Sequence, residues 1–344
     1  MKAMYITKQG PPEVLTYGEL PEPELKPDEV LVRVRACALN HLDVYTRAGV
    51  RGTKRELTKP LVLGCDIAGE VARVGSLVRY LQPGVRVLVN PGTSCGQCPA
   101  CLTGRDNFCR FYETIGSTRD GGYAEYASVP ATNVHPLPDW LSFEEAAAIP
   151  LCYLTAWHML VRRAAIRPGE TVLVQAAGSG VGSAAIQIAK LFGSRIITTA
   201  GTDWKLEKAK ELGADAGINY NRENVADRVK ELTQGEGVDL VFDSVGETVW
   251  EGSVASLKPG GRFINCGVTG GYKASLHMGN MFTRQLTFMG SRMGTRRDLT
   301  EVMEAVAQKK LRGVVGRVFD LQKAAEAHTT MEGRDFFGKL VLRV

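Results

Sequence analysis

The chain has 344 residues, about twice the length of a typical domain, so we expect two domains that share one ligand site. Its 44% hydrophobic residues, 23% charged residues and 38 glycines exclude a disordered protein and indicate a soluble globular one. The net charge of +5 is dispersed among acids, which disfavours a nucleic-acid partner. No apolar run near the N-terminus or elsewhere approaches the length of a signal or membrane-spanning segment, so we expect no membrane association and a cytoplasmic location.

The first 150 or so residues predict a β-rich, barrel-like unit. Short runs of alternating apolar and polar residues are separated there by Gly, Pro and Asp, which is the pattern of strands joined by tight turns. The runs that we predict as strands are 29–39, 67–76, 84–90 and 121–130.

A second domain is predicted to begin near Ser142, where a helical pattern starts with Ser142 as N-cap and is interrupted by Pro150. Strands and helices then alternate, which calls for a parallel sheet with right-handed crossovers. The predicted strands are 170–177, 194–201, 216–220, 237–246 and 261–268, and the predicted helices are 180–193, 204–214, 223–235 and 247–261.

The chain after Gly290 predicts an amphipathic helix at 297–311 and then short segments at 314–321, 323–333 and 338–344. These short segments are similar in character to the edges of the first domain. We therefore expect the C-terminal part to return to that domain.

Residues 172–190 predict a dinucleotide-binding turn, because an apolar strand, a Gly-rich turn and a helix follow one another. Small residues allow the backbone to approach a pyrophosphate, whose charge then faces the positive end of the helix. An ordinary tight turn between strand and helix is the alternative. The predicted phosphate-binding residues are Ala177, Gly178, Ser179, Gly180, Val181 and Gly182.

The next strand favours NADP(H) over NAD(H). An acid that would bind the ribose 2′-hydroxyl is expected at its end, but Ala200, Gly201 and Thr202 stand there. Thr202, Lys205 and Tyr220 offer a hydroxyl, an ammonium and a phenol to a 2′-phosphate. Asp203 is close enough in sequence to serve NAD(H), which is the alternative.

Four cysteines at 95, 98, 101 and 109 predict a zinc site. Thiols separated by two, two and seven residues suit a closed tetrahedral site, in which a zinc ion bound by four sulfurs has no position open for substrate. A disulfide pair or free thiols are the alternative, which a reducing compartment disfavours.

At this point the chain resembles the medium-chain dehydrogenase/reductase superfamily over essentially its whole length. The matching motifs, in the family's order, are NHLDVYTRAG, LGCDIAGEV, the cysteine cluster, AAGSGVG, LTAW, DSVG and GKLVL. The resemblance implies an α/β protein that acts on a small molecule and forms a homodimer or homotetramer through its Rossmann domain. Its implied parts are a GroES-like catalytic domain at 1–152 with a zinc lobe at about 92–112, a doubly wound Rossmann domain at 153–291, and a return to the catalytic domain at 292–344.

The resemblance also implies where the nicotinamide binds. Thr155 is expected to lie against its ring, and Gly267 and Val268 are expected beside its carboxamide. Ser244 and Val245 belong to the DSVG turn next to it.

The sequence departs from the family at the catalytic zinc. The family's ligands are a Cys in the NHLDVY segment, a His in Gly-His-Glu and a Cys or acid before the Rossmann domain. Here Asn40, Cys65 and Leu151 stand at those places, and Asn40 and Leu151 are poor zinc ligands. A rearranged metal site is the alternative, with ligands drawn from His41, Asp43, Cys65, Asp66 and Cys152.

The resulting hypothesis is an oxidoreductase of the quinone-reductase branch that works without catalytic zinc. NADPH would deliver hydride to a quinone, an enone or another activated C=C or C=O compound in a cleft between the domains. Asn40 would polarise the substrate oxygen, and Tyr45 is the candidate proton donor or oxygen ligand. The alternatives are a zinc-dependent alcohol dehydrogenase with rearranged ligands and an NADPH-binding protein without turnover.

Overall fold

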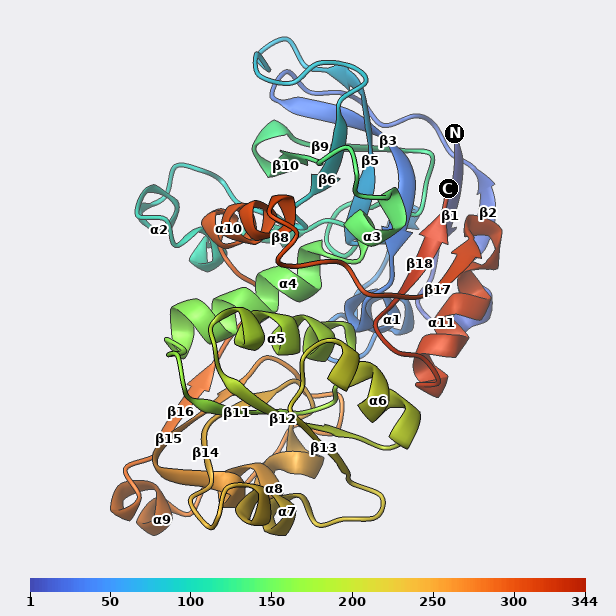
Figure 1. Ribbon diagram of the computed structural model, residues 1–344. Helices are drawn as coiled ribbons and strands as arrows, with labels where there is room; N and C mark the ends of the chain where they lie inside the picture. The colour runs from blue at the N-terminus through green and yellow to red at the C-terminus, as the bar shows by residue number, and fades with distance from the viewer. The chain divides into compact units, whose positions relative to one another are not determined.

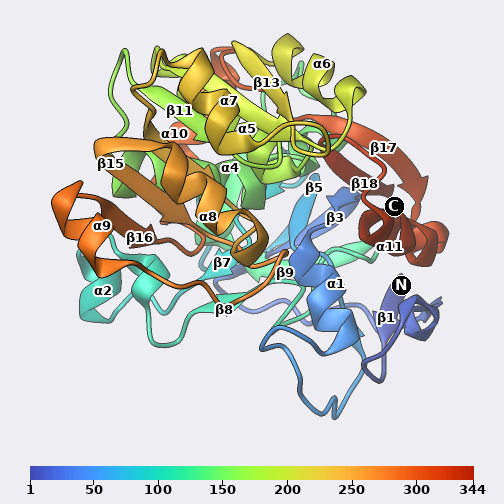
Figure 2. The ribbon, with the colours of Figure 1, turned by 90° about the horizontal axis from the view of Figure 1, so that it is seen from below.

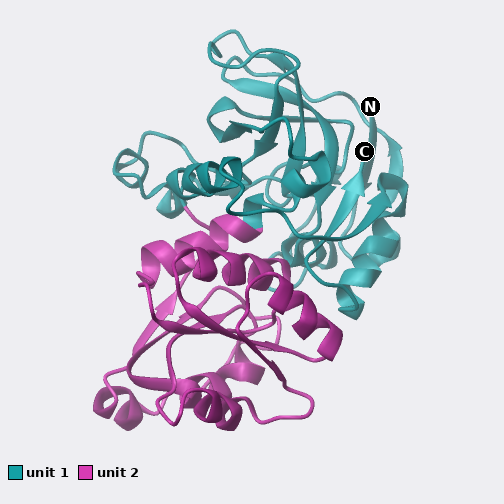
Figure 3. Cartoon of the chain, viewed as in Figure 1, with its two compact units in different colours: residues 1–151, 295–344 teal, residues 152–294 magenta.

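The computed structural model describes residues 1–344, which form two compact units (Figure 3). Unit 1 comprises Met1–Leu151 and Thr295–Val344, and unit 2 comprises Cys152–Gly294. The C-terminal segment therefore belongs to the same unit as the N-terminal half. No helix is both long enough and apolar enough to span a membrane.

Unit 1 is built on a seven-stranded sheet in the order β10-β6-β5-β3-β18-β17, with β9 also paired to β3. All neighbours are antiparallel except β17 and β18. Smaller sheets have the orders β2-β1-β4 and β7-β8. The strands are β1 Lys2–Ile6, β2 Thr16–Glu19, β3 Glu29–Ala38, β4 Leu61–Val62, β5 Asp66–Val74, β6 Arg86–Val89, β7 Gly92–Thr93, β8 Glu113–Thr114, β9 Tyr126–Pro130, β10 Val134–Pro136, β17 Val315–Asp320 and β18 Lys339–Arg343.

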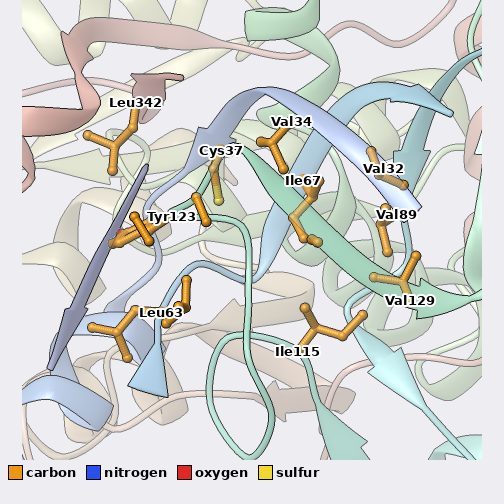
Figure 4. Packing of buried hydrophobic residues seen from close by; sticks show 14 of the residues in the cluster. Val32, Val34, Cys37, Leu63, Ile67, Val89, Ile115, Tyr123, Val129 and Leu342 are labelled. Carbon is orange, nitrogen blue, oxygen red and sulfur yellow. The ribbon is translucent and has the colours of Figure 1, made fainter. Parts of the chain in front are cut away.

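The core of unit 1 lies among these strands. Val32 and Val34 of β3 point into it with Ile67 of β5 and Leu342 of β18, because residues two apart on a strand share a face (Figure 4). The helices of this unit are α1 His41–Ala48, α2 Pro99–Leu102, α3 Phe143–Ala147, α10 Arg296–Ala307 and α11 Ala324–Gly333, with short 3₁₀ turns at Pro12–Val14, Asp106–Phe108, Ala131–Asn133 and Leu321–Lys323.

Unit 2 is a six-stranded sheet in the order β13-β12-β11-β14-β15-β16, parallel throughout. Helices α5 and α6 cover one face, and α7 and α8 lie side by side on the other (Figures 1 and 2). This is the doubly wound Rossmann arrangement that the alternation of strands and helices predicts. Its strands are β11 Thr171–Val174, β12 Arg195–Ala200, β13 Ala216–Asn219, β14 Val238–Asp243, β15 Leu257–Asn265 and β16 Thr287–Gly290.

The first four helices after β11 follow the predicted order, whereas the fifth, α9, and the strand β16 were not predicted. The helices of unit 2 are α5 Gly180–Leu191, α6 Asp203–Glu211, α7 Val225–Leu232, α8 Glu247–Ser256 and α9 Met278–Thr283, while α4 Pro150–Trp157 crosses the boundary between the units and continues as a π-helical segment at His158–Arg163.

Local signals account for most element ends. The Ser142 hydroxyl accepts a hydrogen bond from the Glu145 N–H, so Ser142 caps α3 as predicted. One boundary was predicted wrongly, because β15 begins at Leu257 inside the segment assigned to a helix. The register between β14 and β15 jumps there, from Val238 opposite Leu257 to Leu240 opposite Arg262, and this irregularity absorbs the Pro-Gly-Gly sequence.

Candidate functional site

The predicted phosphate-binding turn joins β11 to α5 in unit 2. Ser179 is the N-cap of α5, and its hydroxyl accepts from the Gly182 N–H at 2.9 Å. A Cβ at Gly182 would lie 2.3 Å from the Ala176 carbonyl oxygen, so a larger residue cannot replace this glycine without moving the turn. The Ala177 N–H donates to the Thr199 carbonyl, which ties the turn to β12. The twelve-residue α5 therefore starts from a fixed, closely packed turn.

The ends of β14 and β15 hold the next group of predicted cofactor residues together. The buried Asp243 carboxylate accepts from the N–H of Val245 at 2.7 Å and from the Asn265 side chain at 2.7 Å. Asn265 also donates to the Gly267 carbonyl, and a Cβ at Gly267 would lie 2.3 Å from the Ser244 carbonyl oxygen.

These contacts bring Ser244 and Val245 to Gly267 and Val268 at the carboxyl edge of the parallel sheet. The turn after β11 and Gly201 after β12 end at the same edge. Ligands of doubly wound sheets bind at this edge.

Thr155 lies on α4 and belongs to unit 2. Its side chain is 5% exposed, and its hydroxyl oxygen is buried without a hydrogen-bond partner. Buried hydroxyls are nearly always paired, so this one fits a bound group that supplies the partner. The residue expected to contact the nicotinamide thus has the property that a cofactor-binding hydroxyl needs.

The region expected to bind the cofactor's ribose contains more polar groups than the sequence analysis named. A Cβ at Gly201 would lie 2.8 Å from the Tyr220 hydroxyl, so the phenol of Tyr220 lies over Gly201. Asn221 donates to the Gly201 carbonyl at 2.8 Å. Thr202 is the N-cap of α6 and makes no side-chain cap bond, and the Lys205 ammonium lies 5.3 Å from the centre of the Trp204 ring.

Asp203 is not an unpaired acid in this region. One carboxylate oxygen accepts from the Asn219 side chain at 2.6 Å, and the other pairs with the Arg222 guanidinium at 2.7 Å. The hydrogen bond from Asn219 and the charge of Arg222 lower the pKa of Asp203. Sequence reasoning missed Arg222, although a basic residue in the NYNR segment just after β13 was a usable signal.

In unit 1, Asn40 and Cys65, two of the three residues at the expected catalytic-zinc positions, belong to a buried polar cluster. We define it as Asn40, Asp43, Cys65, Asp66 and Lys339. Asp66 accepts from the Lys339 ammonium at 2.9 Å and from the Asn40 side chain at 2.9 Å through one oxygen. Its other oxygen accepts from the Leu151 N–H at 2.8 Å. Asn40 in turn accepts from Lys339 at 2.6 Å.

Asp43 closes the cluster at the start of α1. Its carboxylate accepts from the N–H groups of Asn40 at 2.7 Å and Gly64 at 3.2 Å, and the Cys65 thiol donates to it at 3.3 Å. Burial raises the pKa of Asp43 to about 7, while the N–H of Asn40 opposes that rise. Burial also raises the pKa of the Cys65 thiol well above its ordinary value.

The buried polar cluster does not fit a catalytic zinc ion. Both oxygens of Asp66 already accept hydrogen bonds from protein donors, and one of those donors is an ammonium. Leu151 offers its backbone N–H to the cluster and has no side-chain ligand atom. The Asp66 carboxylate is therefore already paired with a cation, the Lys339 ammonium.

Tyr45 lies on α1, one turn beyond the cluster. Its ring is 6.0 Å from the His41 ring and 5.3 Å from the Arg51 guanidinium, measured between centres. Burial lowers the pKa of His41 to about 4, so that imidazole is neutral at pH 7. Asn40 and Tyr45 are thus brought onto the same helix, with Asn40 as its N-cap.

The four predicted zinc ligands come together in unit 1. The ligand atoms of Cys95, Cys98, Cys101 and Cys109 all lie within 4.8 Å of one another. The sulfur–sulfur distances are 3.5 Å for Cys98–Cys101, 3.5 Å for Cys95–Cys109 and 4.0 Å for Cys95–Cys101. Sulfurs at the corners of a zinc tetrahedron are about 3.8 Å apart, since each Zn–S bond is about 2.3 Å. Backbone N–H groups of Gln97 and Cys98 lower the pKa of Cys95 to about 6, which favours the thiolate. The residues therefore fit a structural zinc ion.

Comparison with known proteins agrees with this geometry. Residues 26–139 match the family model "Alcohol dehydrogenase GroES-like domain", and residues 180–308 match "Zinc-binding dehydrogenase". The chain belongs to the medium-chain dehydrogenase/reductase superfamily of zinc alcohol dehydrogenase-like oxidoreductases, and it is an enzyme of that class.

The relatives divide between two named activities. An alcohol dehydrogenase of Geobacillus stearothermophilus is 33% identical over 346 residues, and the match covers all of both chains. A quinone oxidoreductase of Pseudomonas aeruginosa is also 33% identical, with 99% of each chain covered. A solved structure described as an NAD-dependent alcohol dehydrogenase is 48% identical, covers all of both chains and has a TM-score of 0.96.

Proposed function

We propose that this chain is an NADPH-dependent reductase that transfers hydride to a quinone, an enone or another activated C=C or C=O compound without a catalytic zinc. The observation that carries the proposal is the Asp66–Lys339 ion pair in the buried polar cluster. A zinc ion makes alcohol oxidation easy because it stabilises the alkoxide as a Lewis acid. A site that already pairs its carboxylate with an ammonium is better suited to reactions in which hydrogen bonds stabilise the developing charge.

The proposed chemistry divides between cofactor and protein. NADPH, when bound, would supply a hydride to the electron-poor carbon of the substrate and would be left as NADP⁺. The π bond of the substrate C=C would be lost, and its electron pair would shift to give an enolate or quinol anion with its charge on oxygen. A proton then neutralises that anion. Asn40 is the proposed donor that polarises the oxygen, and Tyr45 is the proposed proton donor or oxygen ligand. Thr155, Gly267 and Val268 are proposed to hold the nicotinamide, with Ser244 and Val245 beside it.

The preference for NADPH is supported by the polar groups at the ends of β12 and β13. Arg222 and Lys205 are cations, and Tyr220 adds a hydroxyl above Gly201. A 2′-phosphate carries a negative charge that such groups recognise. Asp203 faces Arg222 in an exposed ion pair, which is weak enough to exchange for a phosphate. NADH remains the alternative cofactor, since one similar structure is described as NAD-dependent.

The experiment that tests this function is a substrate screen coupled to elemental analysis. Oxidation of NADPH and NADH is followed by absorbance with quinones, enones and simple aldehydes, and zinc per chain is measured on the same preparation. We expect turnover with quinones or enones, a preference for NADPH and one zinc per chain. Two tightly held zinc ions together with alcohol oxidation would instead indicate a zinc-dependent alcohol dehydrogenase with rearranged ligands. Several relatives are named as alcohol dehydrogenases.

Two further outcomes are distinguishable in the same experiment. Cofactor binding with no turnover on any substrate would indicate an NADPH-binding protein without catalytic activity. We also propose that the protein acts as a homodimer or homotetramer joined through unit 2, and sedimentation of the same sample measures its mass.

A further inference from the structure

Lys339 is a buried ammonium placed by strand pairing. It is the first residue of β18 and is 3% exposed. The antiparallel register sets Val341 opposite Ala38, and the Leu39 N–H donates to the Leu340 carbonyl. Continuing that register brings Lys339 to Asn40, where β3 has ended and α1 begins. The position of the ammonium is thus fixed by the main chain.

Burying an ammonium is costly unless it is paired and hydrogen-bonded. Lys339 meets both conditions, with its nitrogen 2.9 Å from Asp66 and 2.6 Å from Asn40. The side chains of Lys339 and Asp66 are 4% and 0% exposed, so water does not screen the pair. The Lys339 ammonium therefore lies next to Asn40, the residue proposed to polarise the substrate oxygen. This position suits a role in the reaction as well as in stability.

The contacts fix which way the Asn40 amide faces. An ammonium can only donate and a carboxylate can only accept. The amide oxygen of Asn40 therefore faces Lys339, and its NH₂ group faces Asp66, where the separation is 2.9 Å. The orientation of the amide follows from the chemistry of its two neighbours.

The ammonium strengthens the NH₂ group of Asn40 as a hydrogen-bond donor, because an ammonium on the amide oxygen draws electrons from the nitrogen. One N–H of this nitrogen donates to Asp66 at 2.9 Å, and the nitrogen also lies 3.5 Å from the Ala38 carbonyl oxygen, which is a long contact. The 2.6 Å separation is typical of a short, charge-assisted hydrogen bond. Asn40 is thus held and polarised by a pair of opposite charges.

We propose that Lys339 is a positioning residue of the reaction, acting through Asn40. Its ammonium orients and polarises the Asn40 amide and neutralises Asp66. This inference rests on the proposed function, because it assigns Lys339 a part in stabilising the oxygen that receives charge after hydride transfer.

The test compares Lys339→Met with the double variant Lys339→Met/Asp66→Asn. The single variant leaves a buried carboxylate without its cation, so we expect it to lose both stability and activity. The double variant removes both charges and regains stability, but nothing then determines which way the Asn40 amide faces. We expect its kcat to stay lower than that of the wild type by about 10²-fold, the scale of an oxyanion donor, with the KM for NADPH unchanged.

Lys2→Met is the matched control. Lys2 also lies on a strand of unit 1 and also pairs with an acid, Glu19 at 2.7 Å, but both are exposed. The Lys2→Met variant should retain the wild-type kcat and melting temperature. A double variant that folds and turns over at the wild-type rate would overturn the inference while leaving the proposed function intact. A wild type that reduces none of the quinones or enones would overturn the proposed function, and this inference with it.

Discussion

The protonation state of the buried His328 follows from its two neighbours. Its Nδ1 lies 3.4 Å from the Arg47 guanidinium, and its Nε2 lies 3.2 Å from the Tyr123 hydroxyl. Because a guanidinium can only donate, Nδ1 must accept and the ring proton sits on Nε2. Burial, and then the charge of Arg47, lower the pKa of His328 to about 3. The imidazole is therefore neutral in the folded protein.

This histidine predicts a pH dependence of stability. The unfolded chain binds a proton on it below about pH 6.5, whereas the folded chain does not until about pH 3. The stabilisation by the neutral ring is complete above pH 6.5 and is lost as the pH falls toward 3, by at most about 1.4 kcal/mol per pH unit.

The test is His328→Gln, whose side chain can still accept from Arg47 and donate to Tyr123 but does not titrate. Between pH 6.5 and 4.5 we expect the free energy of unfolding of the wild type to fall more steeply than that of the variant, as measured by urea denaturation. Parallel curves for the two proteins would contradict a neutral, buried His328.

The position of Arg222 leads to a prediction about the preference for NADPH over NADH. If it binds the 2′-phosphate, Arg222→Ala should raise the KM for NADPH about 10-fold or more, since charge-assisted bonds to phosphate are strong. The KM for NADH should change little, because NADH lacks that phosphate. Steady-state kinetics with both cofactors measures this, and Lys208→Ala is the control, since Lys208 is exposed and pairs with Glu211 on the same helix as Lys205. An equal rise of the KM for both cofactors would show that Arg222 does not recognise the 2′-phosphate.

At the scale of elements, sequence reasoning succeeded where a local pattern decides the structure. The strand and helix order of unit 2, the Ser142 cap and the four thiols of the zinc lobe all follow from nearby residues. It failed for β16 and α9, which lie in a segment with no clear periodicity and mostly half-buried or exposed side chains.

The buried polar cluster was only partly predictable for a different reason. Asn40 and Cys65 were identified as departures from a family motif, and Asp66 as a candidate ligand of the alternative metal site. Lys339 is 299 residues from Asn40 in sequence, and its contact depends on the pairing of β18 with β3. No local pattern indicates which lysine will be buried beside a carboxylate. The contact of Asp106 with Arg296 on α10 was likewise not predictable, because the two residues are 190 positions apart in sequence.

The contact between Asp106 and α10 predicts an element-scale effect. The 6% exposed carboxylate of Asp106 accepts from the Arg296 N–H and pairs with its guanidinium, and Arg296 also donates to Ser94, next to the ligand Cys95. Anions at a helix N-terminus stabilise the helix.

Asp106→Ala should therefore lower the melting temperature by about 2–4 °C for each kcal/mol lost in a unit of this size. Hydrogen exchange should be faster both at the start of α10 and in the zinc lobe, as followed by mass spectrometry. Asp139→Ala, at an exposed position of unit 1, is the control. Faster exchange in α10 alone would contradict the prediction that Asp106 stabilises the zinc lobe as well as α10.

At the scale of the whole molecule, the residues predicted to bind the cofactor and the four thiols lie in different units. The residues that fit the dinucleotide lie in unit 2, whereas the four thiols lie in unit 1. The short strands and turns around those thiols, β7, α2 and β8, bury few apolar side chains. A segment of this kind depends on its metal for folding. The metal should therefore matter for the stability of unit 1 and not for the cofactor residues of unit 2.

Removal of zinc tests this division. We expect a chelator, or the Cys98→Ser variant, to release about one zinc per chain and to lower the melting temperature by about 5–10 °C, which corresponds to a few kcal/mol. NADPH affinity, measured by fluorescence well below the transition, should stay within about 2-fold of the wild type, because the ligands and the cofactor residues belong to different units. Cys266→Ser, which removes a thiol outside the lobe, should keep its zinc. Loss of NADPH affinity together with the metal would show instead that zinc contributes to cofactor binding, and would contradict a purely structural ion.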